Sequence, residues 1–321
     1  VEINADTPCF IVESFYANSV AAEHFGQCDP NAGARAQLRD FLAQMHARLA
    51  APVADLTQHT LTSRPFVFSC FDDYPEDLAN TRFLMQVMKE GVPHGDIRFR
   101  SFYEMEIDAH GIPLADNTYA AALYRLHPME ILIDERTADG EPLGAMFLDL
   151  YSEGRFALMN PPEAILLQNK SFMALVHALA ASEQFFSPAE CALVRRYLVP
   201  SYFEDDFSAL TDGRYIRKEI WGREGRNVRV VQKSGSEHTT AFEKQIDYAD
   251  EVICRESRAA MYQDFITQPR FVHTVDSGTM KGCLTLSCFM LFGTPSAVGA
   301  RFSPAEIAGT EAYFVPLVIA E

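Results

Sequence analysis

The sequence predicts an α/β (α+β) protein on three observations. Short apolar segments typical of strands alternate with segments whose apolar residues recur at helical spacing. Two β-rich segments in the second half flank a glycine-bearing loop, as in a hairpin. The chain has 321 residues, 48% of them apolar, which is enough for two or three sub-domains with cores of their own. This composition excludes a disordered chain and a small disulfide scaffold.

The first half is expected to form a small open unit of strands and helices. Residues 1–10 mix apolar and polar positions, which predicts a strand that leads into a loop. Leu38, Leu42 and Leu49 stand among apolar residues at helical spacing and predict a helix over 34–50. The remaining predictions are a strand over 66–70, a helix from Pro75 to Gly91, strands over 97–99 and 104–107, and a turn over 108–111.

Helix starts are marked at three places in the second half. A helix is expected to begin near Asn169, because apolar residues follow it at helical spacing. Ser187 and Glu190 have the spacing of a capping box, with proline at the first helical position. Ser303 and Glu306 repeat this pattern and predict another helix start. Apolar β-rich segments are expected near the end of the chain.

The charge of the chain limits its partners. The chain has 27 Lys and Arg residues and 44 Asp and Glu residues, which gives a formal net charge of −17. A protein that grips nucleic acid needs the opposite balance, so nucleic acid is not an expected partner. An acidic surface can attract a cationic amine, although it also serves solubility alone. The sequence gives no indication of oligomeric state.

Several common kinds of site are excluded by the motifs that are missing. The chain has seven scattered cysteines and no C-x-x-C, which favours a reduced, cytoplasmic protein. It contains no dinucleotide fingerprint, phosphate loop, serine-hydrolase elbow or H-E-x-x-H. No run of about 18 apolar residues occurs, so no membrane-spanning helix is expected.

Two polar clusters near helix or strand starts suit an anionic nucleotide. Alternation along a strand would place Glu2 and Asn4 on one face, about 6–7 Å apart. Carboxylate and amide oxygens are suitable ligands for Mg²⁺, although a solvated polar strand face has the same pattern. Lys170 follows Asn169 at a helix start, where its charge and free backbone N–H groups can hold phosphate. An ordinary first-turn lysine is the alternative.

A cationic hairpin is expected between Tyr215 and Val231. Its loop contains Gly222 and Gly225, which leave backbone N–H groups accessible. Positive residues are dense here in an otherwise acidic chain: Arg214, Arg217, Lys218, Arg223, Arg226 and Arg229. A further glycine-bounded loop, 293–299, precedes Arg301, which could clamp a phosphate in bidentate fashion. A solvated hairpin tip and a surface arginine are the alternatives for these two features.

Taken in order, these clusters resemble the synthetase domain of the glutathionylspermidine synthase family of ATP-grasp ligases. The two most specific phrases are E-I-N-A-D-T-P at 2–8 and K-E-I-W-G-R-E-G-R-N-V at 218–228. Further matching phrases lie at 76–77, 124–130, 168–170, 262–263, 299–301 and 314–316. The resemblance therefore covers essentially the whole chain.

The resemblance implies a permuted ATP-grasp fold with a small open α/β substrate or pre-ATP subdomain. Residues 1–60 would hold the metal-ligand strand and the helix after it, and 61–155 the small subdomain. Residues 156–321 would form the nucleotide-binding and lid region. The family's R-x-D pair, an arginine and a metal aspartate upstream of E-x-N, has no counterpart here, which predicts an N-terminally truncated chain.

The activity that the resemblance implies is ATP- and Mg²⁺-dependent ligation of a carboxylate to an amine through an acyl phosphate. The carboxylate would be peptide-like, such as glutathione, and the amine would be polyamine-like. Glu2 and Asn4 would ligate Mg²⁺, and Arg301 with Lys218 would be catalytic. The nucleotide-binding residues would be Lys170, Lys218, Gly222, Arg223, Glu224, Gly225, Asn227 and Gln263.

Two other functions stay open at this point. The missing R-x-D pair is consistent with a catalytically incomplete remnant that binds MgATP without turnover. A phosphotransferase could use the same nucleotide cradle without forming an amide. Met129 replaces an aromatic residue usual in the family, and 164–166 replace an aromatic-bearing segment, which could alter the choice of substrate.

Overall fold

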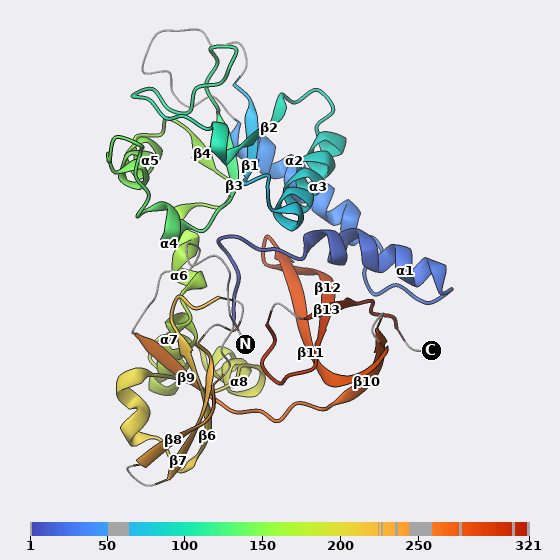
Figure 1. The fold of residues 1–321 in the computed structure, drawn as a ribbon, viewed down its shortest axis with the longest axis vertical. Coiled ribbons are helices and arrows are strands. Elements are labelled where there is room, and N and C mark those ends of the chain that lie inside the picture. The colour runs from blue at the N-terminus through green and yellow to red at the C-terminus, as the bar shows by residue number, and fades with distance from the viewer. Residues whose placement is uncertain are drawn as a thin grey trace. The chain divides into compact units, whose positions relative to one another are not determined.

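Parallel and antiparallel sheets both occur in the protein, which confirms the mixed α/β class (Figure 1). The computed structural model describes residues 2–50, 64–223, 225, 227–234, 237–243, 259–275, 278–309 and 312–319. The chain divides into two compact units. The lysine unit comprises Val1–Ala5, Glu163–Thr285 and Arg301–Tyr313, and the parallel-sheet unit comprises Asp6–Pro162, Leu286–Ala300 and Phe314–Glu321. The division by role at 1–60, 61–155 and 156–321 stays a prediction.

The parallel-sheet unit is built on a four-stranded sheet. Its order is β2 (Ile97–Ser101), β1 (Phe66–Cys70), β3 (Ala122–Leu126) and β4 (Ala157–Leu158), with all paired neighbours parallel. Every residue of β1 and β3 is buried, as expected for central strands covered on both faces. The chain passes from β2 on one side of β1 to β3 on the other. The carboxyl ends of β1 and β3 therefore form a topological switch point, where α/β sheets commonly bind ligands.

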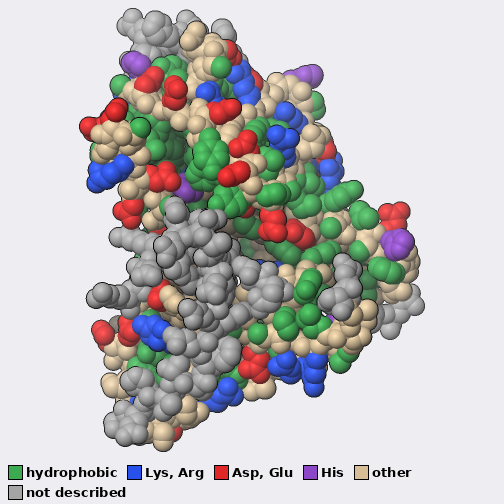
Figure 2. Space-filling model, in the orientation of Figure 1, with side chains coloured by type: hydrophobic (Ala, Val, Ile, Leu, Met, Phe, Trp, Pro, Cys, Tyr) green, Lys and Arg blue, Asp and Glu red, His purple; other side chains and the backbone are tan. Residues whose placement is uncertain are grey.

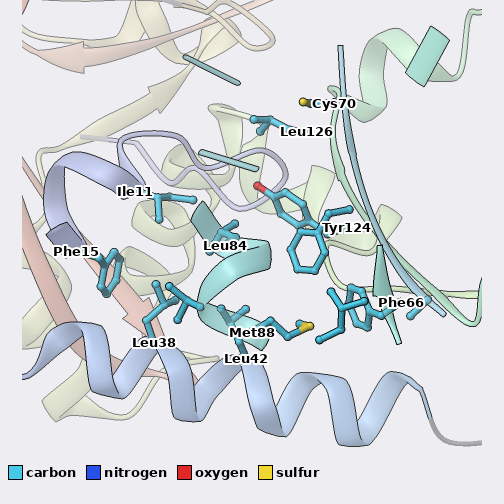
Figure 3. Packing of buried hydrophobic residues seen from close by; sticks show 14 of the residues in the cluster. Ile11, Phe15, Leu38, Leu42, Phe66, Cys70, Leu84, Met88, Tyr124 and Leu126 are labelled. Atoms are coloured by element: carbon cyan, nitrogen blue, oxygen red, sulfur yellow. The ribbon is translucent and has the colours of Figure 1, made fainter. Parts of the chain in front are cut away.

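Two amphipathic helices complete the core of this unit. They are α2 (Ala34–Leu49) and α3 (Pro75–Gly91), and both lie beside the sheet (Figure 1). Figure 3 shows their apolar faces meeting the sheet, with none of these side chains more than 3% exposed: Leu38, Leu42, Leu84, Met88 and Phe66. The other helices of the unit are the π-helix Glu13–Ala17, α1 (Asn18–His24), the 3-10 turn Phe102–Glu104, α4 (Met129–Leu132) and α5 (Leu143–Ser152).

The lysine unit contains an antiparallel sheet. Its order is β5 (Ser201–Phe203), β9 (Ala260–Asp264), β6 (Gly213–Glu219), β7 (Arg229–Ser234) and β8 (Glu237–Glu243). The β6–β7 pair is the predicted hairpin, with Arg217 opposite Arg229. The described helices of the lysine unit are the 3-10 turn Pro162–Ala164, α6 (Ile165–Gln168), α7 (Ser171–Ser182), α8 (Pro188–Tyr197) and the 3-10 helix Glu204–Ala209.

A third sheet contains the β-rich segments expected near the end of the chain. Its order is β10 (Phe271–Val275), β11 (Gly278–Leu291), β12 (Thr294–Ser303) and β13 (Tyr313–Val315). Residues of β11 and β12 belong to both units. Acidic, basic and apolar side chains are interspersed on the face of the protein shown in Figure 2. Among the described residues no single helix is long and apolar enough to cross a bilayer, although Pro162–Gln168 and Ser171–Ser182 pass that test as a pair bent by 70°.

Most of the predicted helices and strands are confirmed, and three predictions are wrong. Residues 2–10 form no strand, and the backbone N–H of Ala5 donates to the Gln168 side chain at 3.2 Å rather than to a neighbouring strand. Residue 104 ends a 3-10 turn, and residues 105–107 form no strand. The capping box at Ser187 is present, but the one expected at Ser303 is not, since that residue ends β12.

Candidate functional site

In the lysine unit, the segment Glu2–Ala5 lies against the start of α7. Glu2 Oε2 is 3.2 Å from Lys170 Nζ, so the two side chains form an ion pair. The Gln168 amide accepts a hydrogen bond from Ala5 N at 3.2 Å and donates one to Asn4 Oδ1 at 3.4 Å. The fold therefore brings together two of the predicted clusters, which lie more than 160 residues apart in the sequence.

Lys170 is held from a second direction by the hairpin. Its backbone N–H donates to Ile220 O at 3.0 Å, and its Nζ donates to Gly222 O at 2.5 Å. The Lys170 side chain is only 10% exposed, whereas that of Glu2 is 45% exposed. The ammonium is thus fixed between the helix start and the hairpin loop, and the Glu2 side chain is the more exposed of the pair.

Lys218 adds a second positive charge to this site. It lies on β6, opposite Met261 of β9. Burial lowers the pKa of Lys218; the Glu2 carboxylate raises that pKa in part and Lys170 lowers it further. Burial raises the pKa of Glu2, but the charges of Lys170 and Lys218 outweigh this and leave that pKa below its ordinary value. Two ammonium groups therefore share one carboxylate, a balance that favours an anionic ligand.

The shape of the hairpin loop depends on two residues with positive φ. Gly225 has φ +76°, and a Cβ there would lie 2.6 Å from Ala308 O, so only glycine fits this close approach. Asn227 has φ +53°, and its Nδ2 donates to Glu219 Oε1 at 3.1 Å. Gly222 N donates to Glu219 O at 3.1 Å. The predicted nucleotide residue Glu224, like Arg226, lies outside the described residues.

The remaining predicted site residues lie elsewhere in the lysine unit. Arg223 is half-buried in the loop. Gln263 lies on β9 and is 3% exposed, and its Nε2 donates to Ser201 Oγ at 2.9 Å. Arg301 lies on β12, in the third sheet, with an exposed side chain. The roles predicted for these three residues in nucleotide binding and catalysis stay predictions.

A protein-family model described as glutathionylspermidine synthase pre-ATP-grasp matches residues 1–320. The chain belongs to this family. The resemblance that the sequence motifs indicated is thereby confirmed over the whole chain. Membership of the glutathionylspermidine synthase family indicates a ligase-type enzyme, and the mixed α/β architecture is consistent with a pre-ATP-grasp protein.

Gln168 is a residue of this site that sequence reasoning missed. In the phrase Q-N-K at 168–170, the local pattern singles out only the lysine. The Gln168 side chain is 8% exposed and contacts both Asn4 and Ala5, which lie more than 160 positions earlier in the sequence. Only its position beside Lys170 could have pointed to it, because no local pattern predicts a contact at that separation.

The donor set at this site fits Mg²⁺. Glu2 and Asn4 supply one carboxylate and one amide oxygen, and Mg²⁺ takes few protein ligands and completes its shell with phosphate oxygens and water. The described residues contain no group of three or more His, Cys, Asp and Glu that could hold a metal ion. The strand geometry predicted for Glu2 and Asn4 is wrong, but Glu2 lies beside Lys170 and Asn4 contacts the neighbouring Gln168.

An acidic rim lies at the switch point of the parallel sheet, in the other unit. We define it as Phe71, Asp72, Asp73, Tyr103 and His127. The Phe71 ring centre is 4.9 Å from those of both Tyr103 and His127. The Tyr103 hydroxyl donates to Asp73 Oδ2 at 3.0 Å, and Asp72 and Asp73 are both exposed. Exposed carboxylates beside aromatic rings are suited to a cationic amine.

Proposed function

We propose that the protein is an ATP- and Mg²⁺-dependent ligase that joins a carboxylate to an amine through an acyl phosphate. One observation carries this proposal: Glu2, Asn4, Lys170 and Lys218 come from three separate segments and cluster in the lysine unit. Membership of the glutathionylspermidine synthase family supports the reaction type. We further propose a permuted ATP-grasp fold, because the segment with the metal ligands precedes both lysines in the sequence.

In this reaction the γ-phosphoryl group of ATP passes to a carboxylate oxygen, giving an acyl phosphate and ADP. The amine nitrogen then attacks the acyl carbon, phosphate leaves, and the nitrogen releases a proton as the amide forms. Activation is needed because a free carboxylate has no adequate leaving group. Water in the site would hydrolyse the acyl phosphate, so the site must exclude it.

The residues of the site take roles that match their chemistry. Lys170 and Lys218 would hold the phosphates and offset their negative charge, and Mg²⁺ held by Glu2 and Asn4 would neutralise charge on the transferred phosphoryl group. The loop 222–227 would cover the nucleotide and exclude water. Arg301 would stabilise the negative charge that develops during transfer.

The family name points to a peptide-like carboxylate such as glutathione and to a polyamine-like amine. We assign the amine to the acidic rim, because Asp72 and Asp73 carry charge of the opposite sign beside aromatic rings. We place the enzyme in the cytoplasm. No disulfide links the six cysteines in the described part of the chain, which suits a reducing compartment.

The test is a reaction of the chain with MgATP, glutathione and a polyamine, followed by phosphate release and product mass. A ligase releases phosphate only when the amine is present and yields a product equal to both substrates less one water. Lys218→Ala is expected to abolish this release. A substrate that gains only a phosphoryl group would identify a kinase, and MgADP binding without turnover would identify a nucleotide-binding protein without ligase activity. Either result would overturn the proposal.

A further inference from the structure

Glu2 carries the same sign of charge as a nucleotide, yet it lies against a lysine that is suited to hold phosphate. Its Oε2 is 3.2 Å from Lys170 Nζ. The other hydrogen bond of this ammonium goes to the Gly222 carbonyl. A phosphate that binds Lys170 must therefore compete with the Glu2 carboxylate.

The carboxylate can move while the segment that carries it stays in place. The Glu2 side chain is 45% exposed and Lys170 is 10% exposed, so the carboxylate is the more accessible partner. Ala5 and Asn4 are anchored to the buried Gln168 amide. Rotation of one side chain would therefore take Glu2 from the lysine to a metal ion that Asn4 also contacts.

We propose that Glu2 makes nucleotide binding depend on a divalent cation. In the free protein it is the counter-ion of Lys170 and repels phosphate. With Mg²⁺ it turns to the metal and leaves Lys170 to the phosphate, so metal and nucleotide each strengthen the binding of the other. This inference rests on the proposed nucleotide site. It makes Glu2 the residue that discriminates between metal-bound and metal-free nucleotide.

The test measures ADP binding by calorimetry in EDTA and in excess Mg²⁺, so that no turnover is involved. Glu2→Gln removes the competing charge, and metal-free ADP is expected to bind about five- to tenfold more tightly than to the wild type. The factor by which Mg²⁺ tightens ADP binding is expected to be at least about tenfold smaller in Glu2→Gln than in the wild type, because this factor measures the coupling between metal and nucleotide.

Two further variants and a stability measurement make the result specific. Glu306→Gln removes an exposed carboxylate from the same unit and is expected to leave both affinities unchanged. Glu2→Asp keeps the charge, so its metal-free affinity is expected to stay within about twofold of the wild type. Thermal unfolding of each variant confirms that it is folded.

The outcomes separate the inference from the proposal beneath it. Wild-type protein that binds MgADP, with Glu2→Gln no tighter for metal-free ADP, would overturn the role of Glu2 and leave the nucleotide site standing. Failure of the wild type to bind ADP in either buffer would overturn the nucleotide site and this inference with it.

Discussion

The two units use paired charges in opposite ways. In the parallel-sheet unit, Asp6 and Arg125 form an ion pair in which both side chains are 0% exposed. Asp6 Oδ2 also accepts from Met129 N at 2.9 Å, and Asn160 Nδ2 donates to Asp6 O at 2.7 Å. In the lysine unit, the Glu2 side chain is 45% exposed and Lys170 is 10% exposed. A buried ion pair with further hydrogen bonds stabilises the fold, whereas a partly exposed ion pair can exchange one partner for a ligand.

The largest expected effect follows from breaking the enclosed pair. Arg125→Met would leave the Asp6 carboxylate buried without its counter-charge, which is expected to lower the free energy of unfolding by about 3–5 kcal/mol. Urea denaturation measures this change, and the double variant with Asp6→Asn should recover part of it. A loss below about 1 kcal/mol would show that the Asp6–Arg125 pair contributes no more to the free energy of unfolding than the Glu2–Lys170 pair does.

The hairpin loop of the lysine unit offers a second comparison with the other unit. Gly225→Ala places a Cβ 2.6 Å from Ala308 O at φ +76°, whereas Gly33→Ala, at φ +85°, meets nothing within 4 Å. Gly33→Ala is expected to cost about 1–2 kcal/mol for the left-handed backbone alone. Gly225→Ala should cost about 2–4 kcal/mol, since the contact adds to that strain. Equal losses in urea denaturation would mean that the loop does not depend on this contact.

Sequence reasoning succeeded where a local pattern determines the structure. The helix Pro75–Gly91 and the strand Phe66–Cys70 follow from apolar periodicity, and the β6–β7 hairpin follows from its glycines and flanking β-rich segments. The capping pattern at Ser187 is satisfied by its own helix. These features need only residues that are close in the chain.

Two of the three failures concern partners that are distant in the chain. Residues 2–10 were expected to form a strand, but Gln168 bonds the backbone of Ala5 instead. The capping pattern at Ser303 is overridden by the sheet: a Cβ on Gly282 of β11 would lie 2.1 Å from Ser303 O, so the two backbones are in close contact. Glu2 and Lys170, which the family resemblance assigned to one nucleotide site, do lie 3.2 Å apart, although their roles there stay predictions.

A smaller effect is expected from the residue that anchors the Glu2–Ala5 segment. Gln168→Leu removes both hydrogen bonds to this segment at nearly constant volume. The affinity of the ADP complex for Mg²⁺ is expected to fall about tenfold, as for other residues that orient a metal ligand. Calorimetry with increasing Mg²⁺ measures this change. Gln232→Leu, at an exposed position of β7, is the control and should leave Mg²⁺ affinity unaltered.

The smallest effect is a pH dependence that both units share. Burial lowers the pKa of His46 in the parallel-sheet unit and of His177 in the lysine unit. The unfolded chain therefore takes up protons at a higher pH than the folded chain does, and stability falls as the pH drops through the ordinary histidine range, about 6.5. Urea denaturation between about pH 7.5 and about pH 5 should show a shallower decline for His46→Gln and for His177→Gln. An unchanged slope in both variants would contradict this assignment.

The central claim is that the charged side chains of the lysine unit bind a nucleotide rather than stabilise the fold. Lys218→Met tests this claim most directly. Calorimetry of MgADP binding should show an affinity reduced by about thirtyfold or more, since a charge-assisted contact to phosphate is lost. The free energy of unfolding should be equal or higher, because burial already disfavours the charged form of this lysine. Lys281→Met, at an exposed position of β11 in the same unit, should bind as the wild type does. An affinity within about twofold of wild type for Lys218→Met would contradict the account.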